Sequence, residues 1–292
     1  MAEDWITIGN DALTAAINPL GAELSSLRDA DGRELMTDAD PAFWTGRAPI
    51  LFPVIGLTQD GIRIDGRRYA IPKHGFARHS LFTLVSHDAT QAVFALEDSE
   101  ATRAVYPYAF RLELTYRLDG ATLVTEARIA NRGEGPMLAS FGFHPAFAWP
   151  LPYGQDRADH RIVFAEDEPG KLKAITPNGL IAAEERASPL DGRTLHLADA
   201  LFTDDALVWS PVHSRSVTYG ANTDATPHLH VAFPDTDKLG IWTKPHAAFI
   251  CIEPWHGIAD PEGFMGDFKD KPGVFEVAEG DAKTIAMSIA LG

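Results

Sequence analysis

The strongest constraint in this sequence is an alternation of apolar and polar residues with a period of two. Every second residue is apolar over Phe110–Leu118, and the alternation resumes over Leu123–Ile129 after Asp119-Gly120. A period of two places successive side chains on opposite faces of a strand, whereas a helix repeats every ~3.6 residues. Asp-Gly between two such runs is typical of a tight hairpin. These residues therefore predict two antiparallel strands joined by a short turn.

The same pattern recurs along the chain, and no segment has the periodicity of a long amphipathic helix. A second hairpin is predicted over Ile62–Ile71, and Met137–His144 is predicted to be a third strand of the first meander. Further strands are expected at Ser216–Tyr219, His228–Phe233, Leu239–Thr243, Ala248–Glu253 and Thr284–Leu291, with short helices at Pro41–Trp44 or Ala198–Phe202. We therefore expect an all-β sandwich of mostly antiparallel strands, formed by residues 1–292 as a single domain.

Charge and composition restrict the partners of such a domain. The chain has 25 Lys and Arg against 41 Asp and Glu, which gives a formal net charge of -16. A field of this sign repels nucleic acid and anionic lipid, and it weakly disfavours phosphorylated substrates. The amino-terminal residues lack the basic and apolar regions of a secretory signal, and no apolar run is long enough to span a bilayer. We expect a cytoplasmic protein without nucleic-acid or membrane partners.

The residues that most often bind metals or cofactors are poorly placed for it. A single cysteine, Cys251, excludes an intramolecular disulfide and a cysteine-rich zinc site. His228 and His230 are two residues apart on a predicted strand, but no third ligand of suitable spacing accompanies them. The sequence also has no nucleotide-binding loop and no nucleophile elbow. We therefore predict that the protein uses no metal and no cofactor.

His144 stands on a predicted strand whose one face carries small residues. Phe141 and Phe143 would point to one face, and Ser140, Gly142 and His144 to the other. Small side chains beside an imidazole leave room for a ligand, and Pro145 would end the strand there. The alternative is a packed, hydrogen-bonded core histidine. The pattern makes His144 a candidate catalytic residue.

Glu253 is expected at the end of an almost wholly apolar strand, on the same face as Phe249 and Cys251. An unpaired carboxylate there would cost several kcal/mol, so it needs a partner or a function. Burial would raise its pKa toward the range of a general base. The alternative is a glutamate that the strand end already exposes to solvent.

Two further segments carry candidate ligand-binding residues. His74 and Arg78 lie in a connection interrupted by Pro72 and Gly75, where a basic side chain can contact an oxygen-rich ligand. Arg47 is flanked by aromatic residues, prolines and glycine, which suits a platform for a sugar. His74 could equally be a solvated loop histidine, and Arg47 could cover apolar surface.

Four motifs in order resemble the aldose 1-epimerase (galactose mutarotase-like) family, specifically its LacX-like bacterial branch. The motifs are Trp44–Pro53, Lys73–Arg78, Gly142–Phe147 and Cys251–Trp255. The resemblance spans the chain from about Ile6 to Ala290. It implies a β-supersandwich fold and an isomerase that interconverts the α and β anomers of a small-molecule aldose.

The resemblance also implies a role for each matching residue. Glu253 would remove the proton of the C1 hydroxyl and His144 would protonate the ring oxygen, while His74 and Arg47 would hold sugar oxygens. Arg78 and Trp255 lie in the matching motifs and would line the sugar site. Asp205 is the best match, by order along the chain, to the aspartate that binds sugar hydroxyls in galactose mutarotases.

Two alternatives remain open at this point. A related branch acts on hexose 6-phosphates and also has a His-Gly-Phe-Ala-Arg stretch, so Arg78 does not separate the two activities. The same sandwich could also belong to a non-catalytic carbohydrate-binding or sugar-sensing protein. The presence of both proton-transfer residues favours the enzyme. The oligomeric state is not predicted.

Overall fold

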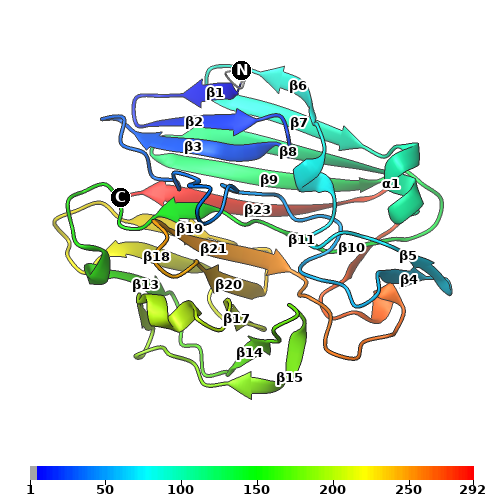
Figure 1. The fold of residues 1–292 in the computed structure, drawn as a ribbon. Helices are drawn as coiled ribbons and strands as arrows, with labels where there is room; N and C mark the ends of the chain where they lie inside the picture. The colour runs from blue at the N-terminus through cyan, green and yellow to red at the C-terminus, as the bar shows by residue number, and fades with distance from the viewer. Residues whose placement is uncertain (1–4) are drawn as a thin grey trace.

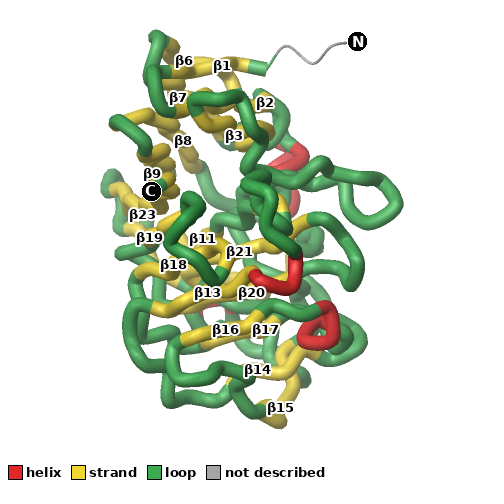
Figure 2. Tube along the Cα trace, turned by 90° about the vertical axis from the view of Figure 1, so that its left-hand side faces the viewer, coloured by secondary structure: helices red, strands yellow, loops and turns green. Residues whose placement is uncertain are grey.

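A large antiparallel sheet of nine strands dominates the computed structural model, which describes residues 5–292. It extends from β6 at the top of Figure 1 through the long central strands to β13, and β16 forms the last strand beyond β13, as labelled in Figure 2. In spatial order its strands are β16 (Thr194–His196), β13 (His160–Phe164), β18 (Ser216–Ala221), β19 (Leu229–Ala232), β23 (Ala282–Leu291), β9 (Thr122–Asn131), β8 (Phe110–Asp119), β7 (Gln91–Glu97) and β6 (Thr83–His87). The predicted hairpin is confirmed, because β8 and β9 are neighbours paired over their whole length.

A second antiparallel sheet has seven strands and contributes to the same core. Its strands are β11 (Phe141–Gly142), β21 (Phe249–His256), β20 (Lys238–Trp242), β17 (Leu207–Trp209), β14 (Leu172–Ile175) and β15 (Ile181–Arg186), with β12 (Ala146–Ala148) also paired to β21. Leu112 and Ile129 of the first sheet and Ile250 and Ile252 of the second belong to one buried hydrophobic cluster. The predicted all-β sandwich is therefore confirmed.

Smaller elements complete the fold. A three-stranded sheet contains β1 (Ile6–Gly9), β2 (Leu13–Asn18) and β3 (Glu23–Asp29), and two-stranded sheets join β4 (Ile62–Ile64) to β5 (Arg67–Tyr69) and β10 (Met137–Ala139) to β22 (Phe275–Val277). The helices are α1 (Glu100–Val105), η1 (Ala77–His79), η2 (Arg157–Asp159), η3 (Asp199–Phe202) and η4 (Phe268–Asp270). Figure 2 shows how long loops connect the strands. Across residues 5–292, no helix is long and apolar enough to cross a bilayer.

The helix predictions were partly wrong. A short 3-10 helix occurs at Asp199–Phe202, as expected, but residues 41–43 form a turn and residue 44 is irregular, so no helix occurs there. The sequence-based reading also missed α1 at Glu100–Val105. Ser99 caps this helix, accepting a hydrogen bond from the backbone N–H of Thr102. A single helix of under two turns gives too few residues for a periodic signal.

The prediction for Met137–His144 also needs correction. The segment divides into β10 and β11, and neither strand joins the β8–β9 meander. β10 pairs with β22, β11 pairs with β21, and the second neighbour of β9 is β23. Alternation assigns side chains to the two faces of a strand, but it does not specify which strand lies alongside. Because β11 belongs to the second sheet, the residues that follow it, including His144, lie beside β21.

Strand β21 is longer than predicted, and this changes the environment of Glu253. The strand continues to His256, so Glu253 lies inside it, opposite Gly240 of β20. Pro254 does not end the strand, although it cannot donate a backbone hydrogen bond. Glu253 is 2% exposed. The solvent-exposed alternative is therefore excluded.

Candidate active site

A cavity of about 230 Å³ lies beside β21, and the predicted site residues other than Arg47 line it. These residues are His74, Arg78, His144, Asp205, Glu253 and Trp255. They come from segments that are far apart in the sequence. Lys73, two further aromatic residues and several apolar residues complete the lining. A small apolar cavity with a few convergent polar groups is the usual form of a small-molecule site.

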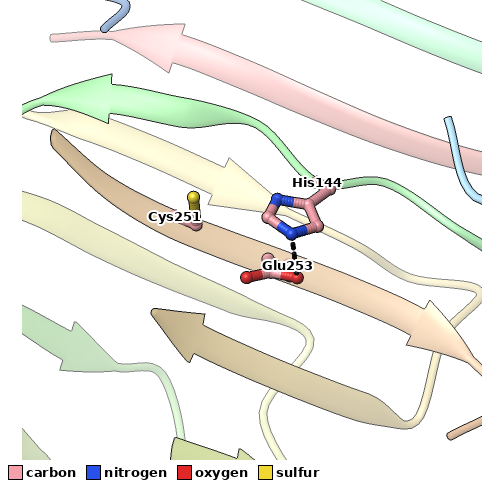
Figure 3. A group of neighbouring side chains, drawn as sticks. All are labelled: His144, Cys251 and Glu253. Carbon is pink, nitrogen blue, oxygen red and sulfur yellow. Dashed lines mark ion pairs between the residues drawn. The ribbon is translucent and has the colours of Figure 1, made fainter. Parts of the chain in front are cut away.

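His144 and Glu253 contact each other directly at this cavity. His144 lies in the link between β11 and β12, and both of these strands pair with β21, which carries Glu253. The imidazole Nε2 is 3.0 Å from the carboxyl Oε2 of Glu253, as Figure 3 shows. Both residues are buried. The two sequence candidates therefore form one unit.

Burial pushes the pKa values of the pair in opposite directions. Desolvation lowers the pKa of His144 to about 3. It also raises the pKa of Glu253 well above its ordinary range, and the nearby negative charge of Asp205 adds to this effect. Both shifts favour uncharged side chains. A protonated Glu253 beside a neutral His144 holds as many protons as a carboxylate beside an imidazolium, so one proton shift along the 3.0 Å contact interconverts the two states.

Aromatic rings surround the imidazole of His144. The centroid of the Trp44 ring lies 5.1 Å from that of His144, and the Trp242 ring meets it edge-on at 6.0 Å. Both tryptophans line the cavity. Apolar ring faces exclude water from the pair and suit the C–H faces of a sugar. The sequence-based reading did not single out Trp242, although Trp44 lies in one of the motifs.

Trp255 fits into the cavity wall because glycine occupies both neighbouring strands. A Cβ atom on Gly142 would lie 2.6 Å from Cδ1 of the Trp255 indole, and one on Gly240 would lie 2.5 Å from its Cη2. Larger residues at either position would displace the ring. The small residues predicted on the strand face of His144 therefore leave space for the indole of Trp255.

His74 is held in place by two hydrogen bonds to the backbone of Gly56. Its backbone N–H donates to the carbonyl of Gly56 (2.9 Å), and its Nδ1 accepts from the backbone N–H of Gly56 (3.1 Å). The proton of a neutral ring must then be on Nε2. Burial lowers the pKa of His74 well below its usual value, so the ring is neutral at pH 7. His74 is thus set up as a hydrogen-bond donor to an oxygen in the cavity.

Gly75 explains why this loop can adopt its shape. Both His74 and Gly75 have positive φ angles, 64° and 73°. A Cβ atom on Gly75 would lie 2.0 Å from the carbonyl oxygen of Phe52. Only glycine tolerates that approach together with a left-handed backbone. The motif around His74 is therefore required to bring the imidazole to the cavity.

Charged groups of both signs line the rest of the cavity. Lys73 and Arg78 contribute cations, and Arg78 also donates to the carbonyl of Lys73 (3.0 Å). Asp205 contributes a carboxylate from the link between η3 and β17. Lys73 lies in the Lys73–Arg78 motif but was not predicted to be a site residue. It is exposed, as loop lysines usually are, so the sequence did not indicate that it also borders a cavity.

Arg47 is the predicted site residue that does not line the cavity. Its guanidinium donates to the backbone carbonyls of Thr37 (2.8 Å) and Asp38 (3.4 Å) and lies over the ring of Trp5, with the ring centroid 5.5 Å away. Through these contacts the side chain of Arg47 links neighbouring loops. The placement does not support its predicted contact with sugar oxygens.

The histidine pair at residues 228 and 230 has no third metal ligand in the described structure, as the sequence predicted. His228 and His230 contact Ala221 and Thr218 respectively, and neither belongs to a cluster of metal ligands. Within residues 5–292 a single group of three close ligands occurs, formed by His144, Cys251 and Glu253. Cys251 precedes Glu253 by two residues on β21, and this spacing was the signal that could have revealed the group.

Comparisons with known proteins identify the family of the chain and structures with the same fold. The sequence model of the aldose 1-epimerase family matches residues 4–263. The chromosomal LacX protein of Lactococcus lactis is 32% identical, over 98% of this chain and 99% of its own length. A galactose mutarotase-like protein from Lactobacillus casei has a TM-score of 0.91 and 28% identity, covering 99% of this chain and 100% of its own. A galactose mutarotase related enzyme from Lactobacillus acidophilus has a TM-score of 0.89 and 29% identity, covering 99% and 97%.

We expect Arg47→Ala to lower stability and to leave the apparent affinity for an aldose within about twofold. The lost hydrogen bonds to two carbonyls should cost about 1–3 kcal/mol of unfolding free energy. Denaturant unfolding and the aldose concentration at half-maximal effect measure the two quantities. Arg78→Ala, which removes a cavity residue, is the matched control and should weaken aldose binding. A large loss of aldose affinity in Arg47→Ala at unchanged stability would contradict this placement and would indicate that Arg47 contacts the sugar.

Proposed function

Because the chain belongs to the aldose 1-epimerase family, we propose that it is a mutarotase that interconverts the α and β anomers of an aldose. The observation that carries the proposal is the buried contact between His144 and Glu253 at the edge of the cavity. Ring opening needs a base for the C1 hydroxyl and an acid for the ring oxygen, held together. This pair provides one of each.

The proposed reaction proceeds in two balanced steps. The Glu253 carboxylate takes the proton of the C1 hydroxyl, the C1–O5 bond breaks as the C1 carbonyl forms, and His144 gives its Nε2 proton to O5. The open chain then rotates about the C1–C2 bond. Closure on the other face of the carbonyl reverses both proton transfers, so the side chains return to their starting state and nothing is consumed.

The electrostatics of the pair support this sequence of protonation states. Ring opening converts a carboxylate and an imidazolium into a protonated Glu253 and a neutral His144. Burial favours the neutral forms, as the opposite pKa shifts of the two groups indicate. The dry site therefore assists the proton transfers that open the ring.

The neighbouring groups would orient the sugar. His74 presents its Nε2–H as a donor, and Asp205 can accept from a sugar hydroxyl. Trp44 and Trp242 offer apolar aromatic surface beside His144. Sugars are commonly bound through this combination of planar apolar walls and a few directed hydrogen bonds. A single-domain organisation and a cytoplasmic location remain predictions.

We predict that Glu253→Gln lowers mutarotation about 10²- to 10⁴-fold, the usual contribution of a positioned acid or base, while sugar binding survives. His144→Asn should have a similar effect. The double variant should be hardly worse than either single one, since both groups act in one step. Polarimetry of freshly dissolved α-glucose or α-galactose measures the rate, and calorimetry measures binding. Near-normal turnover in Glu253→Gln would contradict the assigned roles.

A phosphorylated aldose is a second candidate substrate, and Lys73 and Arg78 are the observation in its favour. Both cations line the cavity, although the negative charge of Glu23 also acts on Arg78. Two such groups together can bind a phosphate. The net charge of -16 acts against this substrate at long range. The free aldose remains the primary proposal.

The two substrates are distinguished by comparing glucose with glucose 6-phosphate on the wild type and on Lys73→Gln. If the substrate is unphosphorylated, kcat/KM is at least tenfold higher for glucose, and Lys73→Gln changes the two sugars alike. A preference for the phosphate that Lys73→Gln abolishes would instead establish the sugar phosphate. Lys244→Gln is a matched control because Lys244 donates to the carbonyl of Phe43 and is absent from the cavity lining.

A further inference from the structure

We propose that His144, Cys251 and Glu253 form a binding site for one Zn²⁺-like cation, and that this cation inhibits the proposed mutarotase by occupying its proton-transfer pair. The imidazole nitrogen, the thiol sulfur and a carboxylate oxygen of the three residues all lie within 4.8 Å of one another. Figure 3 shows the three side chains gathered above β21. No role in the proposed reaction requires Cys251.

The strand pairing explains why the three ligands meet. Cys251 and Glu253 are two residues apart on β21, so their side chains project from the same face of the sheet. Cys251 is paired with Ala146 of β12, and His144 precedes Ala146 by two residues. The backbone therefore fixes all three side chains on one short stretch of the sheet.

The ligand types favour zinc or a similar borderline cation. Nitrogen, thiolate sulfur and carboxylate oxygen are the usual zinc ligands, at about 2.0–2.3 Å, and such bonds place tetrahedral ligands roughly 3.3–3.8 Å apart. The present 3.0 Å between His144 Nε2 and Glu253 Oε2 would open by a few tenths of an ångström. His144 and Glu253 also line the cavity, so a fourth ligand can come from water or a sugar hydroxyl. Three protein ligands with one open position are typical of accessible zinc sites.

The second nitrogen of His144 is compatible with this arrangement. Nδ1 faces away from Glu253 in Figure 3 and is buried, and it makes no hydrogen bond among the described residues. The His144 imidazole also borders a second, smaller cavity, and the buried Thr125 is one of the residues that line it. Zinc-bound histidines carry their proton on the nitrogen that does not bind the metal. The Nδ1 proton leaves Nε2 free as the metal ligand.

Charge balance also permits the complex. Glu253 and Cys251 are both favoured in their protonated forms by burial. Binding of a dication displaces the carboxyl and thiol protons to solvent and leaves a site with no net charge. Neutral complexes are tolerated in a dry environment far better than an isolated charge. The inhibition rests on the proposed function, whereas the binding does not. The cation would bind the Nε2 lone pair and the carboxylate, which are the groups that transfer protons in the proposed reaction.

Titration of the metal-free protein with Co²⁺ tests the site without any use of activity. Co²⁺ substitutes for zinc and gives visible bands in tetrahedral sites, with a near-ultraviolet charge-transfer band when a thiolate is bound. We expect one equivalent to bind with both signals. Cys251→Ala should abolish the charge-transfer band and weaken Co²⁺ binding at least tenfold. Cys251→Ser, closer in size, serves as a second variant, and His230→Ala, which removes a histidine outside the cluster, is the matched control.

Inhibition is then measured by polarimetry with added Zn²⁺. Wild-type mutarotation should fall at least tenfold, chelator should restore it fully, and Cys251→Ala should keep normal activity with at least tenfold lower zinc sensitivity. Absence of Co²⁺ binding, or a spectrum that Cys251→Ala leaves unchanged, would overturn the site. Bound zinc without loss of rate would overturn the inhibition, as would a rate that chelator abolishes and zinc restores. A protein without mutarotase activity would refute the proposed function, but the Co²⁺ spectrum would still decide the site.

Discussion

The buried contact between His144 and Glu253 is the interaction on which the rest of the site depends. A carboxylate and an imidazole removed from water are costly unless they satisfy each other. The fold meets this requirement by pairing both β11 and β12 with β21, so that the link carrying His144 passes over Glu253. The tryptophans then exclude water, and the glycines at 142 and 240 admit the indole of Trp255. The proposed proton transfers depend on the burial of His144 and Glu253 in this arrangement.

The fold could be predicted well where local alternation determines it. The β8–β9 hairpin was visible from its period of two and its Asp-Gly turn, because both signals are local. The route of residues 137–144 was not predictable in the same way. Those residues alternate as a strand should, yet the partner strands β22 and β21 are more than 100 residues later in the sequence. Partner choice depends on the packing of the whole core, which no short window contains.

The sequence allowed most residues of the site to be predicted, but it did not predict which of them contact each other. A glutamate in an apolar strand and a histidine among small residues each indicated chemistry, and the structure brings them to 3.0 Å. Arg47 shows the limit of this reasoning, because an arginine among aromatic residues serves equally well to tie loops together. Cys251 shows a second limit. Its spacing from Glu253 was visible in the sequence, but the approach of His144 from another segment, which completes the group of three, was not.

The central claim is that a desolvated acid–base pair opens and closes a sugar ring. The most direct measurement is the polarimetric rate for wild-type protein, freed of metal, on a broad panel of freshly dissolved aldoses and their 6-phosphates. We expect at least one free aldose to reach anomeric equilibrium far faster than its spontaneous rate, in proportion to protein concentration. Binding of a sugar in the cavity without acceleration for any member of the panel would contradict it and would favour a sugar-sensing protein.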